Sequence, residues 1–97
     1  MIDLKDCGIG EFVSKKEKEQ EIFMVGESAF LVQHKNTVEV RTDEKLKDLL
    51  IERYESVMES RYFGRGGIEI VLSGQLSEEE IKDLIRLSYD LTCQRHI

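Results

Sequence analysis

Proline and tryptophan are absent from this chain of 97 residues, and cysteine occurs only at Cys7 and Cys93. Without proline or a low-complexity tract no linker divides the chain, so we expect one domain over residues 1–97. Two cysteines are too few for a disulfide framework, and we expect reduced thiols. No apolar run approaches the roughly 18 residues of a membrane-spanning helix, and the acidic start lacks the apolar block of a signal peptide. These absences predict a cytoplasmic protein with no membrane partner.

Charge is abundant and unbalanced. Charged residues make up 35% of the chain and hydrophobic residues 40%, which is typical of a soluble globular protein. The net charge is −6, and the isoelectric point is near 4.9. Phosphate binding draws its affinity from clustered lysine and arginine, so this composition argues against a generic nucleic-acid coat. It leaves room for a local basic patch, and the excess acid favours solubility.

The clearest strand and the clearest helix lie in the last third of the chain. Apolar residues occupy every second position from 68 to 72, which predicts a strand with one apolar face, and Val71 on the other face indicates a central strand. A turn follows at 73–75. Ser77 and Glu80 have the spacing of a helix capping box. The helix should then face the sheet with a stripe at helical spacing, formed by Ile81, Leu84, Ile85, Ser88 and Leu91 or Thr92.

The first half of the chain predicts an antiparallel meander. Residues 11–20 are rich in charges of both signs and indicate an edge strand or a loop. Three strands follow, with tight turns between them, at 22–25, 29–33 and 37–41.

A second helix begins after Thr42 or Asp43, one of which should cap it. Its pattern predicts that leucines and a tyrosine face the sheet and that charged residues face water. The expected inward residues are Leu46, Leu49, Leu50 and Tyr54, and the expected outward ones are Lys45, Lys47 and Glu52. A fourth strand is expected at 56–63, and Gly64–Gly67 is expected to turn the chain into the fifth.

This order predicts an α+β fold with two layers, because both amphipathic helices need an apolar face to cover. We expect a mainly antiparallel five-stranded sheet with two main helices on one face.

Several stretches resemble the MmcQ/YjbR family. They are residues 23–30 (FMVGESAF), residues 72–81 (LSGQLSEEEI) and residues 87–91 (LSYDL), which are similar to a hairpin, a strand-to-helix turn and a helix ending of that family. The resemblance covers roughly Glu21 to Thr92. It implies a two-layer α+β fold similar to the type III secretion chaperones, and it implies DNA binding, the role usually assigned to family members.

The chain also departs from the family pattern. Where the family commonly has a His-Trp pair entering its last strand, this chain has Gly66 and Gly67, and the long N-terminal helix of the family is short or missing here. Any function that depends on that tryptophan is therefore not implied for this chain.

One cluster combines arginines, aromatic residues and glycines, in the segment 61–67. Arg61 and Arg65 would contact phosphate and Tyr62 or Phe63 would stack on bases if the segment bound DNA or RNA. The alternative interpretation is a hairpin that glycine permits, with its aromatic residues in the core. The segment matches no phosphate-binding loop motif. Binding to nucleic acid should therefore be weak, and a homodimer would double the patch.

Metal and catalytic sites are not expected. Cys7, His34, Cys93 and His96 match no paired zinc-ligand spacing, and zinc would require all four to converge. Glu78, Glu79 and Glu80 are explained by the start of a helix, where negative charge is favoured. No nucleophile and base have a recognisable context, so we expect no enzyme and no cofactor.

Two functions remain open at this stage. The first is a nucleic-acid-associated binding module that uses the 61–65 hairpin, which the resemblance favours. The second is a protein-binding, chaperone-like adaptor that uses the sheet face or an edge strand, which the acidic charge favours.

Overall fold

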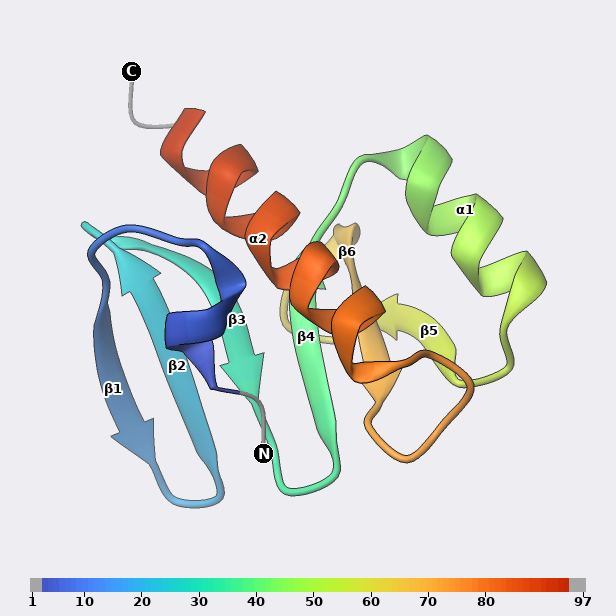
Figure 1. Ribbon diagram of the computed structural model, residues 1–97, viewed down its shortest axis with the longest axis horizontal. Helices are drawn as coiled ribbons and strands as arrows, with labels where there is room; N and C mark the ends of the chain where they lie inside the picture. Colours follow the sequence, from blue (N-terminus) through green and yellow to red (C-terminus); the bar gives the residue numbers. More distant parts are fainter. Residues whose placement is uncertain (1–2, 95–97) are drawn as a thin grey trace.

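A computed structural model describes residues 3–94 of the chain, in which short strands and two main helices alternate (Figure 1). The elements in chain order are a 3-10 helix η1 (Leu4–Cys7), β1 (Val13–Glu17), β2 (Gln20–Val25), β3 (Ser28–Gln33), β4 (Thr37–Arg41), α1 (Glu44–Arg53), β5 (Val57–Ser60), β6 (Gly64–Val71) and α2 (Glu78–Gln94). None of the helices in this range is long and apolar enough to cross a membrane.

The strands form one antiparallel sheet in the order β1-β2-β3-β4-β6-β5. The helix α2 lies across β3 and β4, while α1 packs against β5 and β6 (Figure 1). The predicted α+β class is confirmed, and β6 is central as expected, between β4 and β5. The sheet has six strands instead of five, because the charged segment 11–20 contains the edge strand β1.

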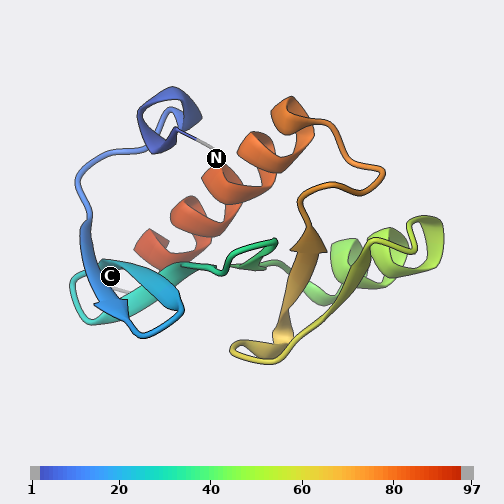
Figure 2. The same ribbon diagram turned by 90° about the horizontal axis from the view of Figure 1, so that it is seen from below.

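The two faces of the sheet have different neighbours. Seen from below, η1 and α2 lie on one side of the sheet, and the turn between β5 and β6 lies on the other (Figure 2). We call this second side the helix-free face. It carries the side chains of Ile22, Val32, Glu39 and Glu69, which alternate along their strands with core residues.

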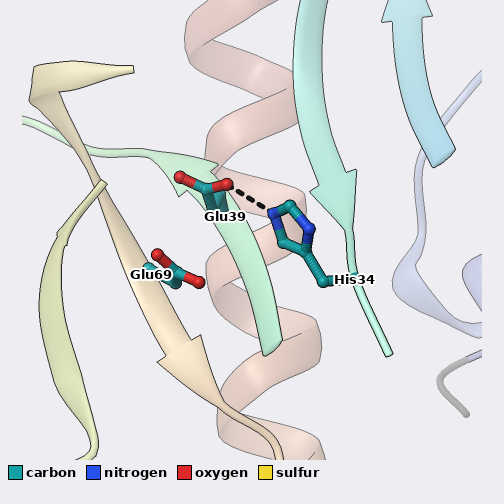
Figure 3. Close-up of side chains that lie close together, drawn as sticks. All are labelled: His34, Glu39 and Glu69. Atoms are coloured by element: carbon teal, nitrogen blue, oxygen red, sulfur yellow. Dashed lines mark hydrogen bonds and ion pairs between the residues drawn. The ribbon is translucent and has the colours of Figure 1, made fainter. Parts of the chain in front are cut away.

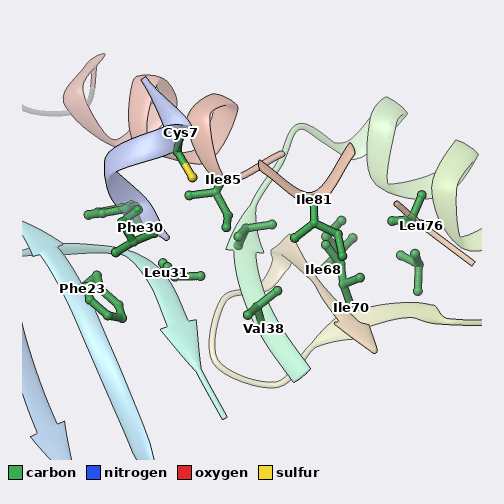
Figure 4. Close-up of a cluster of buried hydrophobic side chains, with 13 residues drawn as sticks. Cys7, Phe23, Phe30, Leu31, Val38, Ile68, Ile70, Leu76, Ile81 and Ile85 are labelled. Carbon is green, nitrogen blue, oxygen red and sulfur yellow. The ribbon is translucent and has the colours of Figure 1, made fainter. Parts of the chain in front are cut away.

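The main core lies between the sheet and the helices (Figure 4). Val40 of β4 and both Ile68 and Ile70 of β6 are fully buried, and Ile85 of α2 is buried against the same cluster. Leu50 of α1 packs against this cluster too, so both helices cover one apolar face, as the sequence pattern predicts.

A β-bulge enlarges this core. Phe23 of β2 pairs with Leu31 of β3, but Met24 pairs with Ala29, so Phe30 is an extra residue on β3. The irregularity lets the adjacent side chains of Phe30 and Leu31 both enter the main core. A plain period-two pattern would have sent one of them to the opposite face.

Helix caps are formed as the sequence predicts. Asp43 accepts a hydrogen bond from the backbone N–H of Leu46 at 2.8 Å and caps α1. At α2, the N–H of Ser77 donates to Glu80 at 3.0 Å, and the N–H of Glu80 donates to the Ser77 hydroxyl at 3.1 Å. Both bonds of the capping box are therefore present. On the inward face of α2, Thr92 is fully buried.

The buried face of α1 differs from the prediction. Leu49 is 57% exposed, whereas Lys47 is only 7% exposed and its ammonium contacts Glu59 of β5 at 3.1 Å. Lys47 lies on the same helical stripe as Leu50 and Tyr54, which do pack on the core. Because α1 covers the end of the sheet rather than its centre, this stripe reaches the sheet edge. There a lysine buries its stem and pairs its charged end.

The turn between β5 and β6 also differs from the prediction. It occupies residues 61–63, and Gly64–Gly67 belong to β6 instead of forming the turn. The chain turns early because Glu39 accepts the N–H of Tyr62 and the Ser60 hydroxyl accepts the N–H of Phe63, at 2.9 and 2.8 Å. The predicted strand at 56–63 is accordingly shortened to β5.

Candidate functional site

Two glutamates face each other on the helix-free side of the sheet. Glu39 of β4 and Glu69 of β6 are direct cross-strand partners, and they are only 2% and 3% exposed (Figure 3). Each lies between two core residues of its strand, so strand alternation sends both carboxylates to the same face. Like charges directly opposite one another destabilise a sheet, and buried charges need partners. The groups that surround the two carboxylates therefore determine whether both can stay charged.

Glu39 is held by three donors. His34, on the turn between β3 and β4, places its Nε2 at 2.6 Å from one carboxylate oxygen. The Ser60 hydroxyl and the N–H of Tyr62 donate to the other oxygen at 2.7 and 2.9 Å. Burial by itself raises the pKa of Glu39, but the hydrogen bonds from Tyr62, His34 and Ser60 outweigh it and bring the pKa below its usual value. The carboxylate is therefore ionised at neutral pH.

Glu69 is held by a hydroxyl and by an arginine. The Thr37 hydroxyl donates to it at 2.8 Å. Arg61 makes a bidentate contact, through Nε at 3.0 Å and Nη2 at 2.9 Å. The Arg61 side chain is 75% exposed although its partner is buried, so the guanidinium covers the carboxylate from the solvent side. Hydrogen bonding to Glu69 raises the pKa of Arg61 further above its already high value.

The four residues of the predicted nucleic-acid site have different environments. Arg61 is paired with Glu69. The Phe63 ring packs against the small apolar cluster of the helix-free face, and the Arg41 guanidinium lies 4.7 Å from its centroid. Tyr62 is 48% exposed, and Arg65 is exposed on β6. Tyr62 and Arg65 are thus exposed, Arg61 is exposed but paired with Glu69, and Phe63 packs on the sheet.

An open groove adjoins the two glutamates. His34, Arg61 and Glu69 line it, together with Glu19, Lys35 and Thr37. The groove continues past the turn between β1 and β2, where Gln20 and its neighbours form the wall. The groove gives solvent and small ions a route to the edge of the buried carboxylate pair.

The second exposed feature is the outer edge of β1. Within residues 3–94, this strand pairs with β2 alone, along Val13–Glu17. Val13 is 60% exposed and Phe12 is 37% exposed. The ring of Phe12 packs edge-on against Phe23, 5.7 Å between centroids. A shallow hollow beside them is lined by Phe12, Val13, Met24 and Val25.

Of the four residues considered for zinc, Cys7 and His34 lie on opposite sides of the sheet. Cys7 is buried in the main core on the side of η1 and α2 (Figure 4), whereas His34 contacts Glu39 on the helix-free side. Cys93 is near the end of α2, and His96 lies outside the described residues. His34 is instead grouped with Glu39 and Glu69, and the ligand atoms of these three residues lie within 4.8 Å of one another.

The glutamate pair was not predicted from the sequence. Within Val38-Glu39-Val40 and Ile68-Glu69-Ile70 each glutamate looks like the polar, solvent-facing residue of an alternating strand. The missing information is that β4 and β6 are neighbours in this exact register and that the 61–63 turn folds over their outer face. The sequence pattern that could have indicated the pair is a single glutamate between two apolar residues in each of the two strands.

Comparisons with known proteins identify the fold. No protein-family model matches the sequence, and no curated protein sequence matches it. Among solved structures, the chain is similar to Deinococcus radiodurans protein DR2400, whose structure is described as a DUF419 domain. The TM-score is 0.85 at 16% sequence identity, over 98% of this chain and 79% of that one. At this identity the likeness establishes a shared small α+β fold.

Proposed function

We propose that this chain is a small, non-enzymatic binding module of the MmcQ/YjbR type that recognises a protein partner through the open edge of β1. The observation that carries the proposal is that β1 is paired on one side only in the described part of the chain, next to the exposed side chains of Phe12 and Val13. An unpaired strand edge presents a row of backbone N–H and C=O groups to which an extended peptide can add as a further strand.

The register indicates which backbone groups would contact the peptide. Glu17 pairs with Gln20 across the two-residue turn at 18–19, so these two residues exchange backbone hydrogen bonds. Bonding to β2 then alternates along the strand. Lys15 is bonded to β2, whereas Ser14 and Lys16 direct their N–H and C=O groups outward.

The side chains of β1 suggest the chemistry of the partner. Lys15 and Lys16 are both exposed, so a second copy of β1 paired antiparallel with either lysine opposite its own counterpart would place like charges together. A segment with acidic residues opposite the lysines and an apolar residue near Val13 is complementary instead. The proposed partner is therefore an acidic, partly apolar extended segment of another protein.

Peptide selection tests this proposal. A displayed library of random peptides is selected against the wild type, and the enriched peptides are synthesised and measured against Lys16→Pro and Lys16→Ala. Proline removes the outward N–H and is tolerated on an edge strand, while alanine keeps the N–H and removes the same charge. We expect Lys16→Pro to lose at least tenfold more affinity than Lys16→Ala, with both variants folded by circular dichroism.

Two results would argue against edge recognition. One is enrichment of peptides that bind both variants equally, which would place the site elsewhere on the surface. The other is a selection that enriches no acidic or apolar sequence.

A second candidate function is weak association with DNA or RNA, as the family resemblance implies. The exposed side chains of Tyr62 and Arg65 favour it, since one is available to stack and the other to contact phosphate. It ranks second because Arg61 already neutralises Glu69 and the chain carries a net charge of −6.

A further inference from the structure

We infer that His34, Glu39 and Glu69 form a binding site for a first-row divalent metal ion such as Zn²⁺, a site that the ion shares in competition with Arg61. The three residues come from the β3–β4 turn, β4 and β6, and their side chains converge on the helix-free face (Figure 3). One imidazole and two carboxylates are a donor set suited to zinc and similar ions.

The distances are close to those that one ion requires. Zinc bonds to imidazole nitrogen and carboxylate oxygen at roughly 2.0–2.2 Å, so two ligands of one tetrahedral ion lie about 3.4 Å apart. The three ligand atoms here lie within 4.8 Å of one another. Binding would therefore draw the most distant ligand atoms together by roughly 1 Å. It would also replace the hydrogen bond between His34 Nε2 and the Glu39 carboxylate, now 2.6 Å long, and release its proton. His34 lies on a turn where its side chain is 22% exposed, which leaves it room for this movement.

The charge of the site independently favours a cation. Two carboxylates, 2% and 3% exposed, stand directly opposite one another on paired strands. Arg61 brings one positive charge to Glu69 from the solvent side. A divalent ion between the carboxylates would bring two and would contact both residues at once, which a single guanidinium bound to Glu69 does not do.

The groove gives the ion a route to the site and gives the Arg61 side chain space to leave it. His34, Arg61 and Glu69 all line it, so an ion enters where the guanidinium now lies. The Arg61 side chain is 75% exposed and can turn into solvent without crossing packed residues. Three protein ligands would leave further coordination positions open toward the groove for water.

Calorimetric titration of the purified, chelator-treated protein with ZnCl₂ tests the site. The background carries Cys93→Ser, so that the partly exposed thiol near the C-terminal end of α2 does not contribute. We expect one ion per chain, with at least a tenfold loss of affinity in His34→Ala and in Glu69→Gln. Arg61→Ala removes the competing cation and should raise the affinity severalfold. Arg65→Ala makes the same charge change on the same hairpin and should leave the affinity unchanged.

Absorption spectra with Co²⁺ give a second readout, because they distinguish nitrogen and oxygen ligands from thiolates. His34→Ala lies on a turn and is expected to fold, so the test remains decisive even if Glu69→Gln does not fold. Absence of stoichiometric zinc binding would overturn the inference. So would binding that survives His34→Ala, or an Arg61→Ala variant that binds more weakly than the wild type.

Discussion

Gly67 occupies one of the most restricted positions of the chain, at the point where β6 passes β4 and the 61–63 turn. A Cβ atom there would lie 2.5 Å from the carbonyl oxygen of Val40 and 2.7 Å from the Cβ of Phe63. At the adjacent Gly66, the nearest atom to such a Cβ is the carbonyl oxygen of Phe63 at 3.7 Å, an ordinary contact. The two adjacent glycines therefore have different roles.

Gly67→Ala should consequently destabilise the protein while Gly66→Ala should not. Overpacking of this kind typically costs about 1–3 kcal/mol. We expect a loss in that range for Gly67→Ala and a change within about 0.5 kcal/mol for Gly66→Ala, measured by urea unfolding. Equal effects for the two variants would show that Phe63 does not fill the space above Gly67.

The glutamate pair shows what a single residue's sequence context does not reveal. The alternation in β4 and β6 correctly predicted which positions are apolar and inward. It could not tell that the outward glutamates are buried, because their burial depends on a turn more than twenty residues from Glu39 in the chain. Sequence periodicity gives the face of a strand, whereas what covers that face is set by tertiary contacts.

At the scale of elements, the two helices differ in how well sequence predicts their buried faces. The pattern of α2 was sufficient because the helix lies across the middle of the sheet, where a broad apolar stripe is buried. The pattern of α1 was misleading at Lys47 and Leu49, because that helix covers the sheet end and buries a narrower stripe. The position of each helix on the sheet determines which of its residues are buried, and this position is not evident from the sequence.

Truncation of one residue on each helix measures this contrast. Ile85 on the inward face of α2 is fully buried, so Ile85→Ala should lower the free energy of unfolding by about 2–5 kcal/mol. Leu49 is 57% exposed, so Leu49→Ala should change stability by no more than about 0.5 kcal/mol. Chemical denaturation of both variants provides the comparison. A large loss of stability in Leu49→Ala would instead support the prediction from sequence that Leu49 faces the core.

At the scale of the whole molecule, the hairpins of the β2–β3–β4 meander were predictable and the strand order was only partly so. The meander through β2, β3 and β4 follows from short turns at 26–27 and 34–36, which the structure confirms. The placement of β6 beside β4, with β5 outside it, joins residues about thirty positions apart in the chain. Such pairing depends on the burial of both helices against a common core. The register of the pairing cannot be read from local sequence patterns.

A salt titration tests whether the chain binds nucleic acid. In the measurement, a fluorescently labelled single-stranded oligonucleotide is titrated with the protein at several salt concentrations. With Arg61 engaged by Glu69, Arg65 is the main phosphate contact that the hairpin offers. We expect weak binding at low salt only, and a slope of log K against log salt close to that of one phosphate, about −0.7.

The variants locate any binding that is seen. Arg65→Ala should remove most of it, whereas Arg86→Ala, the same charge change on α2 across the sheet, should reduce it only slightly. A complex that persists at physiological salt, or a slope corresponding to several phosphates, would require more cationic contacts than the 61–65 hairpin supplies. That result would place nucleic acid ahead of the peptide edge as the ligand of this fold. A slope near one phosphate that Arg65→Ala abolishes would confine nucleic-acid binding to a minor property of an otherwise acidic surface.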